Sequence, residues 1–165
     1  MPMHPASLDE ATLLKDCTTA TTRRSGPGGQ HRNKVETAVI VTHTPTGISA
    51  EANERRSQQA NRQEAIARLR LRLALEVRTS PDGPSELWQS RRSGSRIAVS
   101  DSHADFPSLL AEALDHLQAV DFDTSAAAER LQVSATQLVN LVRKLPAALE
   151  LLNRERSARG LRPLK

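Results

Sequence analysis

The sequence predicts an α+β fold, in which a small β-sheet packs on a long helix and an all-helical module follows. Three observations lead to this class. Residues 35–43 place Val35, Thr37, Val39 and Val41 on one face at period two, which favours a strand. Residues 58–77 repeat apolar positions at helical spacing. After a turn-rich stretch at 79–85, the apolar residues keep helical spacing over much of the remaining chain.

The strands are expected on both sides of a glycine-rich loop. Residues 16–22 are rich in threonine, a β-branched residue that suits a strand. In residues 35–43, Val39 and Val41 lie on one face at period two. Residues 44–47, Thr-Pro-Thr-Gly, then predict a turn, so residues 48–52 can return as an antiparallel partner.

Several local signals predict helix starts and ends. Ser57 can cap a helix over 58–77. Ser134 and Gln137 match a capping box, in which each side chain accepts from a backbone N–H. Further helices are expected from Pro107, over 125–131, after Ser134 and from Pro146 to Gly160. We therefore expect a first domain over 1–78, a linker and extended segment over 79–106, and a helical module over 107–165.

Three arginines of the long helix, Arg62, Arg68 and Arg72, lie away from its apolar stripe. A solvated helix surface and contact with nucleic acid are both open interpretations of these side chains.

Composition favours some functional classes for this protein and argues against others. The net charge of +4 over 165 residues and the pI near 10 favour a polyanionic partner. Only three aromatic residues occur, which argues against a base-stacking platform. No apolar run approaches the roughly 20 residues that cross a bilayer, and the start lacks a signal pattern, so we expect a cytoplasmic protein. Cys17 is the only cysteine and no zinc spacing occurs, so no metal and no cofactor are expected.

A glycine-rich segment carries the most specific signal. Gly28-Gly29-Gln30 alone would be weak, because paired glycines are common in loops. Its surroundings read RSGPGGQHRNK over 24–34, PTGI over 45–48 and RSQQANR over 56–62. In this setting the sequence resembles the peptidyl-hydrolase domain of class I peptide chain release factors and of their shorter relatives that rescue stalled ribosomes. The resemblance covers roughly residues 10–78.

The resemblance implies a ribosome-dependent hydrolase of the ester that joins the nascent peptide to tRNA. Side chains at Gly28 and Gly29 would collide with RNA or restrict the backbone angles. Gln30 would stabilise the transition state with its backbone N–H and help position water with its side-chain amide. The expected partners are large-subunit rRNA, peptidyl-tRNA and a glutamine methyltransferase that modifies Gln30, and the protein is expected to be a monomer.

Basic side chains on both sides of the loop are expected to contact rRNA phosphates, because a guanidinium can bind two oxygens at once. They are Arg24, Arg32, Lys34, Arg55, Arg56 and Arg62. Simple surface exposure is the alternative for each of them.

The helical half leaves its function open. Residues 126–138 resemble a helix-turn-helix, although plain three-helix bundles share this pattern. Residues 153–165 hold five basic residues against one acidic residue. They could form a short version of the basic tail with which rescue hydrolases sense an empty mRNA channel.

No segment of this sequence resembles the stop-codon-reading domain of full-length release factors. We therefore expect codon-independent peptidyl-tRNA hydrolysis on stalled ribosomes. One alternative is a noncatalytic ribosome- or RNA-binding quality-control module that keeps the loop for docking. Another is a DNA-binding regulator built on the helix-turn-helix, which shows no evident dimerisation segment.

Overall fold

A computed structural model describes residues 2–22 and 37–165 of the chain. They form two compact units, which we call the sheet unit, Leu8–Leu73, and the helical unit, Met1–Ser7 with Ala74–Lys165. The division falls inside one long helix. Helices together with small antiparallel sheets confirm the predicted α+β class.

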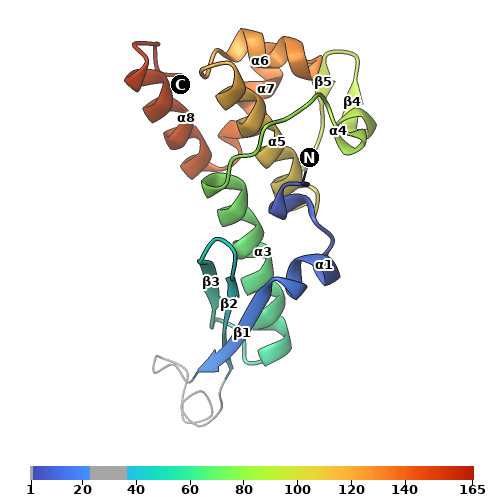
Figure 1. Ribbon diagram of the computed structural model, residues 1–165, viewed down its shortest axis with the longest axis vertical. Coiled ribbons are helices and arrows are strands. Elements are labelled where there is room, and N and C mark those ends of the chain that lie inside the picture. The colour runs from blue at the N-terminus through green and yellow to red at the C-terminus, as the bar shows by residue number, and fades with distance from the viewer. Residues whose placement is uncertain (1, 23–36) are drawn as a thin grey trace. The chain divides into compact units, whose positions relative to one another are not determined.

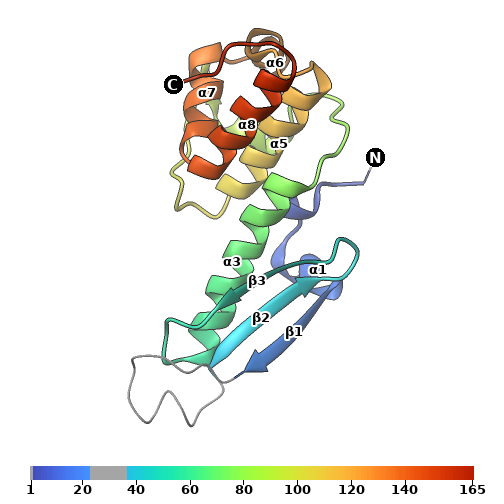
Figure 2. The ribbon, with the colours of Figure 1, turned by 90° about the vertical axis from the view of Figure 1, so that its left-hand side faces the viewer.

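The sheet unit is a three-stranded antiparallel sheet with a long helix beside it (Figure 1). Strand β2 lies between β1 and β3, and α3 runs along the sheet in both views (Figures 1 and 2). Its elements are α1 Glu10–Lys15, β1 Cys17–Thr22, β2 Ala38–His43, β3 Ile48–Ala52 and α3 Gln58–Glu76. Each predicted strand and the predicted long helix are therefore present, within a few residues of the expected bounds.

The core of the sheet unit follows the predicted periodicities. Val39 and Val41 of β2 are buried, and so are Ile66, Leu69 and Leu73 of α3. Alternate strand residues and every third or fourth helix residue thus share one apolar interior.

The β2–β3 turn and the start of α3 also confirm local signals. Gly47 has a φ of +71°, which a residue without a Cβ adopts readily, and its N–H donates to the carbonyl of His43 over 2.8 Å. At the start of α3, the Ser57 hydroxyl accepts from the Ala60 N–H over 3.2 Å, as expected of a cap.

The helical unit packs α5, α6 and α7 on one another, with α8 against α7. Its elements are η1 Pro5–Ser7, α4 Glu86–Arg91, β4 Arg92–Ser93, β5 Arg96–Ile97, α5 Phe106–Ala119, α6 Thr124–Leu131, α7 Ala135–Arg143 and α8 Pro146–Ala158. Trp88 is fully buried, and its indole N–H donates to the carbonyl of Leu131 over 2.9 Å. Trp88 is therefore part of this unit's core.

Residues 79–106 differ from the expected linker and extended segment. Thr79 donates from its backbone N–H and its hydroxyl to Asp115 of α5, over 3.1 and 2.6 Å. Ser85 donates in the same two ways to Glu112, over 2.7 and 2.6 Å. The turn-rich stretch is thus bound to α5 at both ends, because two carboxylates satisfy its polar groups. It lies within the helical unit, which also contains α4, β4 and β5.

Half of the predicted capping box is present at α7. The Ser134 hydroxyl accepts from the Gln137 N–H over 3.1 Å, as predicted. The reciprocal bond, from the Ser134 N–H to the Gln137 side chain, is replaced by two others. Gln137 Oε1 accepts from the Ile97 N–H over 3.2 Å, and the Ser134 N–H donates to the carbonyl of Ser95 over 3.0 Å. The β4–β5 hairpin therefore takes the place of the second half of the box.

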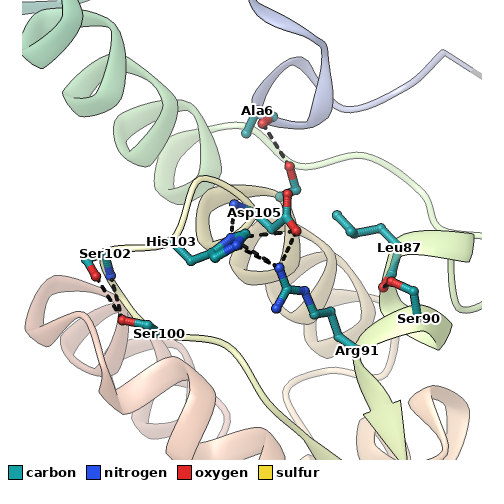
Figure 3. Close-up of polar contacts among 9 residues, drawn as sticks. Ala6, Leu87, Ser90, Arg91, Ser100, Ser102, His103 and Asp105 are labelled. Atoms are coloured by element: carbon teal, nitrogen blue, oxygen red, sulfur yellow. Dashed lines mark hydrogen bonds and ion pairs between the residues drawn. The ribbon is translucent and has the colours of Figure 1, made fainter.

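Polar contacts also fix the start of α5 (Figure 3). Arg91 donates to the carboxylate of Asp105 over 2.7 Å and lies 2.9 Å from Nε2 of His103. The Ser108 hydroxyl donates to the carbonyl of Ala6 over 3.2 Å, which ties η1 to α5. These contacts join three segments of the helical unit that are distant in sequence.

Candidate functional site

Most of the residues that sequence analysis assigned to the site lie outside the described residues. These are the proposed catalytic residues and half of the expected phosphate contacts: Gly28, Gly29, Gln30, Arg24, Arg32 and Lys34. The described residues show what surrounds this segment.

The strands on either side of the segment bring its two ends together. Thr22, the last described residue before it, pairs with Ala38 in the antiparallel ladder of β1 and β2. The described chain resumes at Thr37, which is buried. Residues 22 and 37 are therefore held at the same end of the sheet, which is the anchorage that a functional loop requires.

A buried asparagine on α3 connects two backbone segments at this end of the sheet unit. Asn61 is fully buried. Its Nδ2 donates to the carbonyl of Thr37 over 2.7 Å and to the carbonyl of Arg55 over 2.9 Å, and its Oδ1 accepts from the Arg55 N–H over 2.9 Å. One side chain thus restrains both the entry to β2 and the loop before α3. Asn61 is a positioning residue for the end of the sheet from which residues 23–36 extend.

The three described members of the expected phosphate-binding set lie close together in sequence. Arg55 and Arg56 are exposed in the loop that Asn61 holds. Arg62 lies near the start of α3 and is half-buried. No described residue accepts a hydrogen bond from its buried Nε. Contact with RNA stays a prediction for all three side chains.

Arg62 also lines a cavity of about 230 Å³ on the sheet unit. Its described lining is Thr19, Thr21, Val39, Gln58, Gln59 and Arg62. None of these lining residues carries a negative charge, so this surface is compatible with an anion.

Arg68 and Arg72, also on α3, have a structural role. Arg68 donates to the carbonyl of Glu51 over 2.8 Å and pairs with Glu54 over 2.9 Å, and Arg72 donates to the carbonyl of Ser49. The hydrogen bond from Arg68 lowers the pKa of Glu54. Both arginines therefore satisfy carbonyl groups of β3, which is an edge strand of the sheet.

One signal in the sequence marks Asn61, which lies outside the motif residues expected to be functional. Asn61 lies four and eight residues before Ala65 and Leu69, both of which are buried, so a polar side chain occupies the apolar face of the helix. A buried polar side chain needs hydrogen-bond partners, and asparagine is otherwise disfavoured in helices. That placement could have identified Asn61 as a positioning residue.

The described residues offer little chemistry of their own. Burial raises the pKa of Cys17, which disfavours the reactive thiolate form. Within residues 2–22 and 37–165, no cluster of three or more His, Cys, Asp or Glu side chains could hold a metal ion. The described part of the site positions backbone segments through Asn61, and phosphate binding by its arginines stays a prediction.

Among the helices that the structure describes, none is both long and apolar enough to span a bilayer.

Comparison with known proteins identifies the family. The RF-1 domain matches residues 10–103, more than half of the chain. The chain therefore belongs to the RF-1 domain family of class I release factors. The match extends beyond residues 10–78, which carry the resemblance in sequence, into α4 and the β4–β5 hairpin.

Three curated relatives are similar over a shorter stretch. Peptide chain release factor 1 of Xylella fastidiosa is 48% identical over 67 residues, 41% of this chain and 18% of the relative. The chloroplastic peptide chain release factor PrfB1 of Arabidopsis thaliana is 54% identical over 52 residues, 32% of this chain and 11% of the relative. Peptide chain release factor 1 of Leptothrix cholodnii is 50% identical over 72 residues, 44% of this chain and 19% of the relative. The chain thus spans less than a fifth of the length of each.

Proposed function

We propose that this protein hydrolyses peptidyl-tRNA on stalled ribosomes without reading a codon. One observation carries the proposal: the Gly28-Gly29-Gln30 motif lies within the stretch that matches the RF-1 domain. The paired strands and Asn61 support it, because they anchor the ends of the segment that carries the motif. Codon independence is the expectation from the sequence, and the peptide-release assay below tests it directly.

The reaction is the hydrolysis of an ester. Water adds to the peptidyl carbonyl carbon, and the bond between that carbon and the ribose oxygen of tRNA breaks. The proton that water loses passes to this oxygen, which departs as a ribose hydroxyl. The backbone N–H of Gln30 stabilises the developing oxyanion, and its side-chain amide positions the water. Ribosomal RNA supplies the remainder of the active site.

The partners follow from this reaction. The protein acts as a monomer on large-subunit rRNA and peptidyl-tRNA, and a glutamine methyltransferase modifies Gln30. Arg24, Arg32, Lys34, Arg55, Arg56 and Arg62 bind rRNA phosphates. The protein works in the cytoplasm, where ribosomes stall.

Peptide release from defined ribosomes tests the proposal. Ribosomes stalled on a truncated message, with labelled peptidyl-tRNA, are incubated with protein that carries either unmodified or methylated Gln30. We expect release from these ribosomes, and no faster release when a stop codon occupies the decoding site. Intact peptidyl-tRNA with both forms of the protein contradicts the proposal.

A pair of glycine variants separates catalysis from docking. Gly29→Ala should lower release on the order of 100-fold or more, a loss comparable to that of an oxyanion donor, while ribosome binding remains. Gly83→Ala is the matched control, because a Cβ at Gly83 would meet no atom within 4 Å. Ribosome binding by the wild-type protein without any release would favour the noncatalytic module.

A further inference from the structure

Helix α7 presents an exposed polar face in the helical unit. Leu138, Leu141 and Val142 are buried, whereas Asn140 and Arg143 are exposed on the opposite side of the helix. Figure 2 shows α7 at one side of the helical unit. This exposed face belongs to the second helix of the pattern that resembles a helix-turn-helix.

The β4–β5 hairpin adds a cation near the N-terminal end of α7. Strand β5 packs on α7, and the bonds of Ser95 to Ser134 and of Ile97 to Gln137 fix the hairpin there. Arg96 is exposed on β5. The hairpin therefore holds a basic side chain close to the helix without covering the exposed face.

The last residues of the chain fold back toward the other end of α7. Asn153 accepts from the Leu164 N–H over 2.6 Å and donates to the Leu164 carbonyl over 2.8 Å. Arg156 donates to the carbonyl of Arg162 over 2.8 Å, and Arg143 donates to the carbonyl of Lys165. In Figure 2 the C-terminal end lies beside α7. The basic end expected as a tail is thus held in a defined fold.

Exposed cations gather around α7 as a result. We define the α7 basic face as Arg96, Asn140, Arg143, Lys144, Arg162 and Lys165, all of which are exposed. Segments 92–97, 135–144 and 161–165 contain no aspartate or glutamate. None of the five cations pairs with an aspartate or glutamate among the described residues, whereas Arg159 of α8 pairs with Glu155 over 2.8 Å. Arg143 bonds the terminal residue Lys165, and the Lys144 ammonium donates to the carbonyl of Val99. The face keeps an excess of positive charge, which favours a polyanionic ligand.

We propose that the α7 basic face binds the phosphate backbone of structured RNA. A helix-turn-helix that reads bases uses the N-terminal residues of its second helix. In α7 these are Ala135 and Thr136, while Arg143 and Lys144 lie at the opposite end. Cations at that end and on both flanks suit phosphate contacts, which position a protein without reading sequence.

This second RNA contact goes beyond the proposed hydrolysis, and the choice of RNA over DNA rests on the proposed action on ribosomes. Helix α7 spans roughly 14 Å from its first to its last residue, so cations at its two ends can reach phosphates several nucleotides apart.

Charge-reversal variants of the full-length chain test the inference. The probe is a short fluorescein-labelled RNA stem-loop, titrated at several salt concentrations, with duplex DNA of equal length in parallel. Arg143→Glu/Lys144→Glu and Arg96→Glu/Lys165→Glu each reverse two charges of the face. The matched control, Arg130→Glu/Arg154→Glu, reverses two exposed arginines on α6 and α8. Thermal unfolding verifies the fold of each variant.

We expect both face variants to weaken RNA binding about tenfold or more and to reduce the slope of log K against log salt by about 2, since each lost phosphate contact reduces it by about 1. The control should change binding much less. Equal losses in the face and control variants overturn the inference, and so does tighter binding to duplex DNA, which would favour the DNA-binding regulator.

Repeating the titration with Gly29→Ala keeps this inference separate from the proposed hydrolysis. RNA binding at the α7 basic face should be unchanged in that variant even though peptide release is lost. Wild-type protein that binds RNA through the face but releases no peptide would refute the hydrolysis alone. Release without any contribution of the face to RNA binding would refute the inference alone.

Discussion

The sheet unit and the helical unit use buried groups differently. Of the twelve largest fully buried side chains among the described residues, nine belong to the helical unit, including Trp88 and Phe106. The sheet unit has few large core residues. Instead, Asn61 binds backbone groups of a loop, and Arg68 and Arg72 bind carbonyls of the edge strand β3. The helical unit is thus stabilised mainly by apolar packing, and the sheet unit depends more on side chains that hold backbone segments.

This difference suits the proposed roles. Functional residues on a loop need anchored ends, because a misplaced catalytic group loses most of its effect. Hydrogen bonds are directional and can fix the path of a loop, whereas apolar burial is not directional. Substitutions in the two units should therefore fail in different ways, and four predictions test this.

The largest effect is expected for Trp88 in the helical unit. Trp88→Ala should lower the free energy of unfolding by about 3–5 kcal/mol, because it leaves a cavity in the core. Circular dichroism during denaturation with urea measures the loss. Trp88→Phe, which keeps a ring but loses the hydrogen bond to Leu131, should cost clearly less. Equal costs for the two variants would show that the hydrogen bond, and not packing, dominates at this position.

The next largest effect on stability is expected for Asn61 in the sheet unit. Asn61→Leu removes the bond to the buried Thr37 carbonyl and the two bonds to the partly buried backbone groups of Arg55, which costs about 2–3 kcal/mol. At a temperature where the variant stays folded, peptide release should still fall, because the ends of the loop lose their restraint. The decrease should exceed the one expected from the lower stability alone. The control is Gln63→Leu, an exposed position on the same helix. Unchanged release per folded molecule would contradict the role of Asn61 in positioning.

Local signals account for what could be predicted of the fold. Ser57, Pro107, Ser134 and Pro146 mark helix starts within one or two residues, because capping and proline geometry depend on the nearest neighbours in the chain. The small β4–β5 hairpin escaped prediction, since two-residue strands are too short to show any alternation.

The unpredicted features of the candidate site involve contacts between residues that are distant in sequence. Asn61 binds a carbonyl 24 residues away, and Arg68 binds one 17 residues away. Helical spacing places Asn61 on the apolar face of its helix, but only the fold shows which backbone groups Asn61 binds and that Arg62 lines a cavity. The catalytic assignment of Gly28, Gly29 and Gln30 stays a prediction that rests on their motif.

A smaller effect is expected where α3 supports the edge of the sheet. Arg68→Met and Arg72→Met should each cost about 1 kcal/mol, because both guanidinium groups are partly solvated and bind carbonyls of β3. Hydrogen exchange should accelerate mainly at amides of β2 and β3. Arg56→Met, an exposed position, serves as the control for stability. If exchange rises instead throughout the sheet unit, then α3 and the strands open together and the arginines do not act locally.

The smallest effect is a pH dependence of the helical unit. Burial, with a smaller contribution from Arg130, lowers the pKa of His116, and burial also lowers the pKa of His4. In unfolded protein a histidine binds a proton near pH 6.5, whereas these two resist protonation when folded. The unfolded state therefore binds more protons below about pH 6.5, so the free energy of unfolding should fall as the pH drops through that value.

His116→Leu isolates one part of this pH dependence. Both ring nitrogens of His116 are buried, and the interaction with the Gly83 backbone does not offset the effect of burial on the pKa, so leucine removes poorly satisfied polar atoms and restores apolar packing. The fall in Tm between about pH 7 and pH 5.5 should be reduced by about 1–3 °C relative to wild type. Glu112, whose pKa burial raises, acts in the opposite direction and is common to both proteins. The exposed His103→Gln should not reduce the fall, and an equal reduction there would contradict the assignment to a buried histidine.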